Sequence, residues 1–392
     1  MIFPIIADTF FWVAVVGCSL QLLGIVCLII FYFHKAPPLK KRSGSYPGIT
    51  MIKCCVNAFD NEEENFDVFF RQDYPGPQQL IFTVPDLSAP VVPVIQSYLA
   101  KYPDADAQML VSTTREALWK KVDAIHDGMQ VAKHPIVLLS DSDSVVHENY
   151  FSENVACLED ADTSLVTIPQ YDFRMNTFGS ALKLGNTCDL ATFVMISWAF
   201  SKSPRFGWGH SMAFWKDDFD SFGEYTWSYL NDFLADDVAI PNLFTVHGLK
   251  VRFANIFCPV QYSNKTVNDV VQQKRRWAWC QKIVIPNKWL YLLATMVYPQ
   301  VPATLAVLFS GFAPWSLAFW LGCAGVRVLV STAHELLFQK SLKTNLRYFW
   351  TIVLWDLGQV FFVLETFFSD TIDFNGKRYR VVNRYFLDRV PL

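Results

Sequence analysis

The chain has 392 residues, of which 52% are hydrophobic, 16% aromatic and only 18% charged. This composition is more apolar than that of an ordinary soluble domain, so part of the chain is expected to lie in lipid. The formal net charge of −3 lacks the basic excess that nucleic-acid binding usually needs, which makes nucleic acid a poor candidate partner. The apolar residues are concentrated at the two ends, whereas residues 40 to 285 have the mixed pattern of a globular domain.

The first apolar segment, Phe10 to Phe33, is predicted to be a retained membrane-spanning anchor. Its about 24 uncharged residues, at ~1.5 Å rise each, can cross a ~30 Å hydrocarbon core. No small-residue cleavage site closes it, and no basic start precedes it, so it is not a typical signal peptide. Positive charge next to a span marks the cytosolic side, so we expect the globular domain in the cytosol. The residues concerned are His34, Lys35, Lys40, Lys41 and Arg42.

The membrane itself is left open by the sequence. A cytosolic catalytic domain would face the Golgi or endoplasmic reticulum membrane in a eukaryote, and the inner membrane in a bacterium. The nine cysteines show no disulfide or metal-ligand spacing, which suits a reducing compartment.

Three further apolar segments lie toward the C-terminal end. Trp289 to Ser310 and Pro314 to Glu335 are credible membrane spans. Phe349 to Phe368 holds three polar side chains, which are costly in a single span. If all three segments crossed, the basic tail would lie outside, against the positive-inside tendency. We therefore expect the third segment to be re-entrant or interfacial, with the tail on the cytosolic side. Its polar residues are Asp356, Gln359 and Glu365.

These segments predict four parts of the chain. Residues 1–34 form the N-terminal anchor, and residues 35–285 form the globular domain. Residues 286–370 form transmembrane or re-entrant helices, and residues 371–392 form the basic tail.

The globular part is predicted to be an α/β domain with a mostly parallel sheet. Strand-length apolar runs alternate with helical stretches, which is the order of elements typical of parallel sheets. In such sheets ligands bind beyond the carboxyl ends of the strands, so acidic residues just after a strand are candidate site residues. The predicted strands are 50–57, 79–84, 108–112, 135–140 and 164–168, and the predicted helices are 66–71, 91–101 and 118–133.

The sharpest local motif follows the buried-strand pattern of residues 135–140. It is Asp141-Ser142-Asp143, a DxD motif at the predicted end of a strand. Two carboxylates one residue apart can share Mg²⁺ or Mn²⁺, and this cation can bridge the pyrophosphate of a sugar nucleotide. Because DxD occurs often by chance, a solvated acidic turn is the alternative interpretation.

Two further acidic sites have weaker patterns. Asp86 follows another predicted strand and could accept hydrogen bonds from a nucleotide base or ribose. The alternative is that it only stabilises a turn, as an Asp next to a Pro usually does. Asp236 and Asp237 are adjacent carboxylates, and one of them could act as a general base. The alternative for this pair is an exposed helix cap.

The most specific motif lies just before the C-terminal apolar segments. Gln273, Arg276 and Trp277 form a QxxRW sequence. The Arg can pair with a diphosphate bidentately, and the flat Trp can wall an acceptor site. The alternative is that these juxtamembrane basic residues contact lipid head groups.

Together the motifs resemble those of a known superfamily. The order D, D, D, (Q/R)xxRW is typical of processive-type inverting glycosyltransferases with the GT-A fold, and over about residues 10 to 385 the chain looks like the ceramide glucosyltransferase family and its bacterial relatives. The motifs here are Asp86, Asp141-Ser142-Asp143, Asp237 and Gln273-x-x-Arg276-Trp277. Supporting segments are Pro47 to Thr50, Phe70 to Pro75, Leu234 to Asp237 and Asn375 to Arg380.

This resemblance implies a Rossmann-like GT-A domain and an activity. The activity is transfer of glucose from UDP-glucose to the primary hydroxyl of ceramide with inversion, which gives β-glucosylceramide on the cytosolic leaflet. It implies that Asp86 binds the uridine part of the donor. It also implies that Asp141 and Asp143 bind a divalent metal, Mn²⁺ or Mg²⁺, and with it the diphosphate.

The resemblance assigns the remaining site residues as well. Asp237 would deprotonate the acceptor hydroxyl, and Arg276 would hold the diphosphate. Asp236, Gln273 and Trp277 would belong to the region of the acceptor and the diphosphate. Of the stretch Trp119-Lys120-Lys121, only Lys121 carries over as a donor contact.

Alternatives to this function stay open at the level of the sequence. Relatives with similar motifs glycosylate diacylglycerol or hopanoid lipids, sometimes from UDP-N-acetylglucosamine, and UDP-galactose is a further possible donor. A different class of function is a catalytically inactive membrane scaffold. The intact carboxylates argue against the scaffold.

Overall fold

The computed structural model describes residues 2–34, 38–39, 45–55, 62–114, 117–159, 163–201, 203–233, 235–262, 264–285, 287–340, 342–374, 377–381 and 387–389. The basic residues Lys35, Lys40, Lys41 and Arg42 lie outside these ranges, as does part of the tail. The chain forms two compact units. The sheet unit comprises His34–Asp172 and Phe200–Gln261, and the helical unit comprises Met1–Phe33, Phe173–Ala199 and Tyr262–Leu392.

The sheet unit is built on a seven-stranded sheet with the strand order β3-β2-β1-β4-β7-β5-β8. All five strands predicted from the sequence are confirmed, and the α/β class with them. The strands β1, β2, β3 and β4 pair in parallel, whereas β7 runs antiparallel to both β4 and β5. The strand bounds are β1 Ile49–Cys54, β2 Gln78–Val84, β3 Ala107–Val111, β4 Ile136–Asp141, β5 Leu165–Thr167, β7 Ser211–Trp215 and β8 Val251–Phe253.

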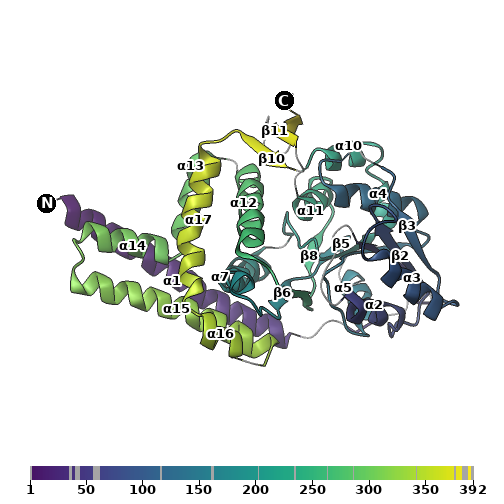
Figure 1. The fold of residues 1–392 in the computed structure, drawn as a ribbon, viewed down its shortest axis with the longest axis horizontal. Helices are drawn as coiled ribbons and strands as arrows, with labels where there is room; N and C mark the ends of the chain where they lie inside the picture. Colours follow the sequence, from purple (N-terminus) through teal and green to yellow (C-terminus); the bar gives the residue numbers. More distant parts are fainter. Residues whose placement is uncertain are drawn as a thin grey trace. The chain divides into compact units, whose positions relative to one another are not determined.

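Helices surround these strands, as Figure 1 shows for α2, α3, α4 and α5. The strands β1 and β4 are buried along almost their whole length, because helices cover both faces of a parallel sheet. A small second sheet pairs β6 with β9. The other elements of this unit are α2 Glu62–Phe70, α3 Val92–Lys101, α4 Lys120–Val131, α5 Tyr150–Leu158, β6 Gln170–Phe173, α9 Lys216–Asp220, α10 Tyr225–Asn231, α11 Asp236–Val246 and β9 Cys258–Gln261.

The register of the parallel strands brings three candidate site residues to one edge of the sheet. Cys54 of β1 is level with Thr83 of β2 on one side and with Asp141 of β4 on the other. Asp86 follows β2, and Asp143 follows β4. The acidic residues that end these strands therefore lie at the carboxyl edge, as the sequence predicted.

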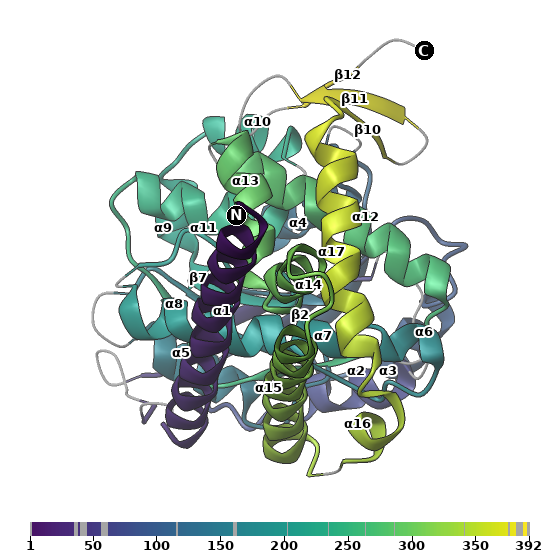
Figure 2. The same ribbon diagram turned by 90° about the vertical axis from the view of Figure 1, so that its left-hand side faces the viewer.

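Among its described residues, the helical unit contains two helices that are long and apolar enough to cross a membrane, α1 Ile2–Phe33 and α15 Pro314–Phe338. They run in the same direction, because Phe11 contacts Trp315 and Phe319 near the start of α15, whereas Tyr32 contacts Phe338 at its end. Figure 2 shows the two helices side by side. The expected anchor at Phe10 to Phe33 and the expected span at Pro314 to Glu335 are thus both helical.

The other expected span, Trp289 to Ser310, is not one straight helix. The helix α13 Lys288–Ala294, with the 3₁₀ turn Thr295–Val297, is bent by 87° relative to α14 Gln300–Phe309. A broken span or a re-entrant loop has this geometry. Pro299 lies at the bend, and it approaches α1 closely at Gly17, where an added Cβ would lie 3.5 Å from the Pro299 Cα. A proline cannot donate the backbone hydrogen bond that continues a helix, which explains the break.

The segment Phe349 to Phe368 contains α17 Thr351–Phe367, a helix of 17 residues. At ~1.5 Å rise per residue it is about 25 Å long, shorter than a ~30 Å hydrocarbon core. The polar side chains of Asp356 and Gln359 are turned inward and buried, whereas Glu365 pairs with Arg275 at 2.8 Å. Its re-entrant or interfacial placement stays a prediction.

The remaining elements of the helical unit include the QxxRW helix and a C-terminal sheet. The sheet pairs β10 with β11 and β11 with β12, both antiparallel. The bounds are α6 Phe178–Ala181, α7 Leu184–Asp189, the π-helix Leu190–Val194, α8 Met195–Phe200, α12 Val267–Val284, α16 Lys343–Tyr348, β10 Thr371–Phe374, β11 Lys377–Val381 and β12 Leu387–Arg389. The predicted boundary at residue 285 stays untested, although residues 173–199 and 262–285 group with the apolar helices.

A glycine controls how closely α4 packs on the sheet. A Cβ added at Gly128 would lie 2.8 Å from Cγ2 of Ile52 on β1. Replacing a mid-helix Gly by Ala normally stabilises a protein by about 0.5–1 kcal/mol. Here we expect Gly128→Ala to destabilise, because overpacking a core costs about 1–3 kcal/mol. Thermal unfolding should show a lower midpoint than wild type, with the exposed Gln130→Ala on the same helix as control. An unchanged or higher midpoint for Gly128→Ala would contradict this packing.

Candidate functional site

The DxD motif lies where β4 ends. Asp141 is the last residue of β4, and Asp143 is two residues further on in the turn that follows. The backbone of this turn is held by two hydrogen bonds, from Gln261 N to Asp143 O at 3.2 Å and from Val145 N to Pro259 O at 2.9 Å. The two carboxylates are thus presented by a fixed strand end, and both are only partly exposed.

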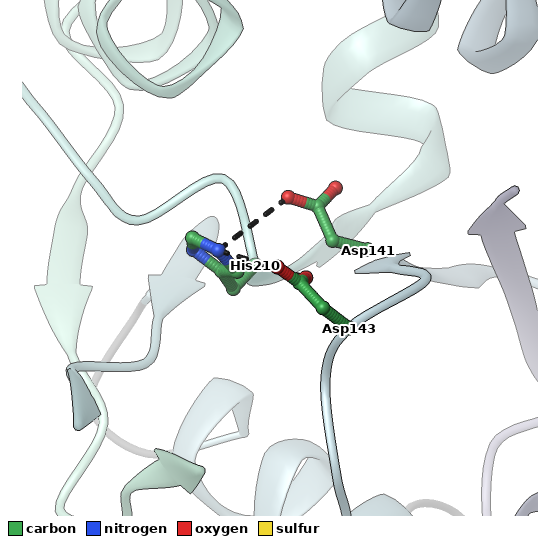
Figure 3. Close-up of side chains that lie close together, drawn as sticks. All are labelled: Asp141, Asp143 and His210. Atoms are coloured by element: carbon green, nitrogen blue, oxygen red, sulfur yellow. Dashed lines mark ion pairs between the residues drawn. The ribbon is translucent and has the colours of Figure 1, made fainter. Parts of the chain in front are cut away.

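A histidine that the sequence analysis missed completes this cluster. His210 directly precedes β7, and its Nε2 lies 3.7 Å from Asp143 Oδ1 and 3.9 Å from Asp141 Oδ2 (Figure 3). The antiparallel register pairs Ser140 with Ser211, which places His210 opposite the motif. The signal in the sequence is slight: His210 follows a glycine and is separated by one serine from the apolar run Met212 to Trp215.

Lys121 joins the DxD motif to the start of α11. Its ammonium lies 2.7 Å from Asp141 Oδ1, 2.7 Å from Asp236 Oδ2 and 2.8 Å from the carbonyl oxygen of Gly209. The side chain is buried, with 6% of its surface exposed. Burial alone would lower the pKa of Lys121, but the carboxylates of Asp141 and Asp236 outweigh it and raise the pKa. Lys121 is therefore a fixed positive charge.

Gly209 permits this arrangement. A Cβ added there would lie 2.9 Å from the Lys121 ammonium and 3.3 Å from Asp236 Oδ2. Its neighbour Gly207 donates a backbone hydrogen bond to the carbonyl oxygen of Asp237 at 2.6 Å. The glycine-rich loop before β7 thus packs directly against the acidic start of α11.

A second buried lysine, also missed by the sequence analysis, supports the strand end. Lys53 on β1 donates to the backbone carbonyl of Asp141 at 2.7 Å, and its ammonium lies 4.4 Å from the Phe69 ring. Burial lowers the pKa of Lys53. A lysine inside an apolar strand gives no sequence signal, because its partner is 88 residues away along the chain.

Asp86 lies in a turn, whereas Asp237 lies at the start of a helix. Asp86 Oδ1 accepts hydrogen bonds from the backbone N and the hydroxyl of Ser88, at 2.8 Å and 2.5 Å. This is the turn chemistry that the sequence offered as the alternative. Asp237 lies in the first turn of α11, next to Asp236, and is less buried than that neighbour.

The QxxRW motif lies on α12, in the helical unit. The helix begins with a capping box, in which Thr266 accepts from Asp269 N at 3.2 Å and the Asp269 side chain accepts from Thr266 N at 2.8 Å. Gln273 accepts a hydrogen bond from the Tyr262 hydroxyl at 2.5 Å. The predicted motif residues are therefore helical and held in place.

Trp277 on the same helix faces a buried lysine. The Lys183 ammonium lies 5.2 Å from the Trp277 ring centre and 3.9 Å from that of Tyr262. The two rings therefore form part of a cation–π environment around Lys183. Arg276 belongs to the same helix.

The structure brings five of these residues together in the sheet unit. Lys121, Asp141, Asp143, Asp236 and His210 form one cluster, and Asp86 lies at the same sheet edge. Gln273, Arg276 and Trp277 share a helix in the other unit.

Part of the cluster fits a divalent cation. One ligand atom from each of Asp141, Asp143 and His210 can be chosen such that all three lie within 4.8 Å of one another. Carboxylate oxygens suit Mg²⁺ and Mn²⁺, and an imidazole is also a common ligand of transition metals. Burial lowers the pKa of His210, but Asp143 and Asp141 together raise it. A bound cation would replace the histidine proton in balancing the two carboxylates.

A solved structure shares this fold. The mannosyltransferase PcManGT from Pyrobaculum calidifontis, in complex with GDP-Man and Mn²⁺, is similar over 91% of this chain and 99% of its own, with a TM-score of 0.50 and 16% sequence identity. The chain thus has the mostly parallel α/β fold of the GT-A type.

Sequence comparison places the chain more narrowly. The family model of glycosyl transferase family 21 matches residues 9–385, so the chain belongs to this family. Ceramide glucosyltransferase 1 from Caenorhabditis elegans is 28% identical over 142 residues, and ceramide glucosyltransferase from Candida albicans is 30% identical over 137 residues. These matches cover 34% and 32% of this chain, and 29% and 25% of the relatives.

We expect Asp143→Asn and His210→Ala each to weaken Mn²⁺ binding at least tenfold, because each removes one of three converging ligands. Titration of the purified protein with Mn²⁺, followed by electron paramagnetic resonance of the free ion, measures the dissociation constant. His147→Ala is the matched control, since His147 pairs with Glu153 outside the cluster. Affinity that is unchanged in both site variants would exclude this cluster as the metal site.

Proposed function

We propose that this protein transfers glucose from UDP-glucose to the primary hydroxyl of ceramide, with inversion at the sugar. The cluster of Asp141, Asp143, His210 and Lys121 at the carboxyl edge of the sheet carries this proposal, because it supplies both metal ligands and a fixed cation for a diphosphate. The order of the four motifs, the family membership and the names of the relatives support it.

The donor end of the proposed reaction uses the sheet edge. Asp86 would accept hydrogen bonds from the uridine part. A divalent cation held by Asp141, Asp143 and His210 would neutralise the departing diphosphate. Lys121 would add a second positive charge that does not titrate near neutral pH.

The acceptor end needs a single base. In an inverting displacement, the acceptor oxygen forms the new bond to the anomeric carbon while the bond to the diphosphate breaks on the opposite face. Asp237 would take the hydroxyl proton. Asp236 suits this role less well, because Lys121 already pairs with its carboxylate at 2.7 Å. Arg276 would hold the diphosphate, with Gln273 and Trp277 shaping the acceptor region.

The membrane-anchored character of the chain supports a lipid acceptor. The helices α1 and α15 are long and apolar enough to cross a bilayer. An enzyme anchored in this way meets its acceptor at the membrane surface, and we propose that the sheet unit faces the cytosol.

Product analysis tests the donor and the acceptor together. Purified protein with Mn²⁺ would be offered UDP-glucose, UDP-galactose or UDP-N-acetylglucosamine with ceramide, diacylglycerol or a hopanoid, and the products identified by mass spectrometry. We expect glucosylceramide. A glycosylated diacylglycerol or hopanoid would replace ceramide as the acceptor. Absence of every product, together with no thermal shift on adding UDP and Mn²⁺, would leave a membrane scaffold.

The base is tested by Asp237→Asn. We expect this variant to lose transfer by at least a thousandfold while its UDP affinity stays within about twofold of wild type, because an amide cannot accept the acceptor proton. Isothermal titration with UDP and a radiolabelled transfer assay give the two quantities. Asp217→Asn, an exposed carboxylate on α9, is the control and should keep full activity. Loss of UDP binding in Asp237→Asn would instead place this residue at the donor.

A further inference from the structure

A fully buried arginine lies in the apolar helix α15. The Arg327 side chain has no exposed surface, and its guanidinium pairs with Asp356 of α17 and with Asp189 of α7, the latter at 3.0 Å. It also donates to the side-chain oxygen of Gln21 on α1 at 3.1 Å and to the carbonyl of Gly185 at 3.2 Å. An ionisable group in a segment that can span a membrane is costly, so its retention calls for a function.

This ion network continues to the helix that carries the QxxRW motif. Trp355 of α17 donates from its indole to Asp189 Oδ2 at 2.8 Å. Lys274 of α12 lies 3.1 Å from the centre of the same Trp355 ring and donates to the Trp355 carbonyl at 3.3 Å. With its amide in the orientation that satisfies both of its groups, Gln359 accepts from Lys274 Nζ at 2.6 Å.

The network, which we term the buried ion cluster, consists of Arg327, its carboxylate partners Asp189 and Asp356, and the buried Lys274 that contacts Trp355 and Gln359. The cluster joins α7, α12, α15 and α17 within the helical unit. Lys274 is the sequence neighbour of Gln273, and the ring of Trp355 lies 6.5 Å from that of Trp277. Two of the three motif residues are therefore next to a member of the cluster or to its central tryptophan.

The cluster is not arranged for maximum stability. Among the described residues, Arg327 Nε and Asp356 Oδ2 are buried without a hydrogen-bond partner. Unpaired buried polar atoms of this kind cost free energy. Well-packed apolar side chains would often be at least as stable as a buried ion network. What the charges supply instead is directionality, because each contact fixes an orientation as well as a distance.

We propose that the buried ion cluster positions α12, so that Gln273, Arg276 and Trp277 are held in one orientation for sugar transfer. Lys274 and Arg327 are then positioning residues, and neither touches the reacting atoms. This inference rests on the proposed function, since it assigns the QxxRW helix to the transfer reaction. The adjacent Arg275 offers a contrast, because it forms a partly exposed ion pair with Glu365, and neither residue belongs to the cluster.

The test compares Lys274→Met with Arg275→Met, which change two neighbouring basic residues on one helix. We expect Lys274→Met to lower kcat for transfer at least tenfold, with the KM for the sugar donor within twofold of wild type. Arg275→Met should stay within twofold for both. Hydrogen exchange read by mass spectrometry should show faster exchange in α12 of Lys274→Met only, with β1 and β4 unchanged. Equal kcat and equal α12 exchange in the two variants would overturn the inference.

A milder change guards against misfolding of Lys274→Met. Trp355→Phe keeps a ring against Lys274 but removes the indole hydrogen bond to Asp189. We expect it to fold, as judged by an unaltered thermal shift on adding UDP and Mn²⁺, and to show faster α12 exchange with a severalfold lower kcat. Protected α12 in this variant would overturn the inference. Failure of the proposed function can be told apart from failure of this inference. In the first case the wild-type protein would transfer sugar to no lipid, while hydrogen exchange would still report on α12.

Discussion

The contact of the Lys121 ammonium with Asp141 and Asp236 is the interaction on which the candidate site depends. It joins the end of β4 to the start of α11, two places that are far apart in sequence. Two carboxylates this close to one another would repel in a partly buried site, and the lysine removes that repulsion. It also holds Asp141, which belongs to the candidate metal cluster. A side chain in place of Gly209 would press against this ammonium, because an added Cβ would lie 2.9 Å from it.

Both units meet the cost of buried charge in the same way, by balancing it locally. In the sheet unit, Lys121 pairs with the carboxylates of Asp141 and Asp236, and Lys53 donates to the backbone carbonyl of Asp141. In the helical unit, Arg327 pairs with Asp189 and Asp356, and Asp189 also accepts the indole hydrogen bond of Trp355. In each case the partners come from different elements, so the ion pairs also fix how those elements pack. The polar residues of α17, which look incompatible with an apolar environment, are accounted for by this pairing.

Much of the fold could be predicted because it depends on local sequence patterns. The five strand-length apolar runs, the DxD position after β4 and the helical character of α1 and α15 follow from periodicity and length. The bend between α13 and α14 was not predicted, since a continuous apolar stretch conceals it, although Pro299 marks its place. His210 was missed because it reaches Asp141 only through the antiparallel pairing of β7 with β4. The register of two strands is not visible in one sequence.

Local patterns along the chain specify five of the strands, the apolar helices α1 and α15, and the acidic and basic motifs, because side-chain periodicity acts over a few residues. The tertiary structure alone decided which charges meet. Only the pairing of β4 with β7 brings His210 to the DxD motif, and only the packing of α4 against the sheet brings Lys121 between two carboxylates. Helix packing likewise brings Arg327 into contact with Asp189 and Asp356. Ion pairs and metal ligands depend on distances through space, and these are set by the assembled core rather than by neighbours along the chain.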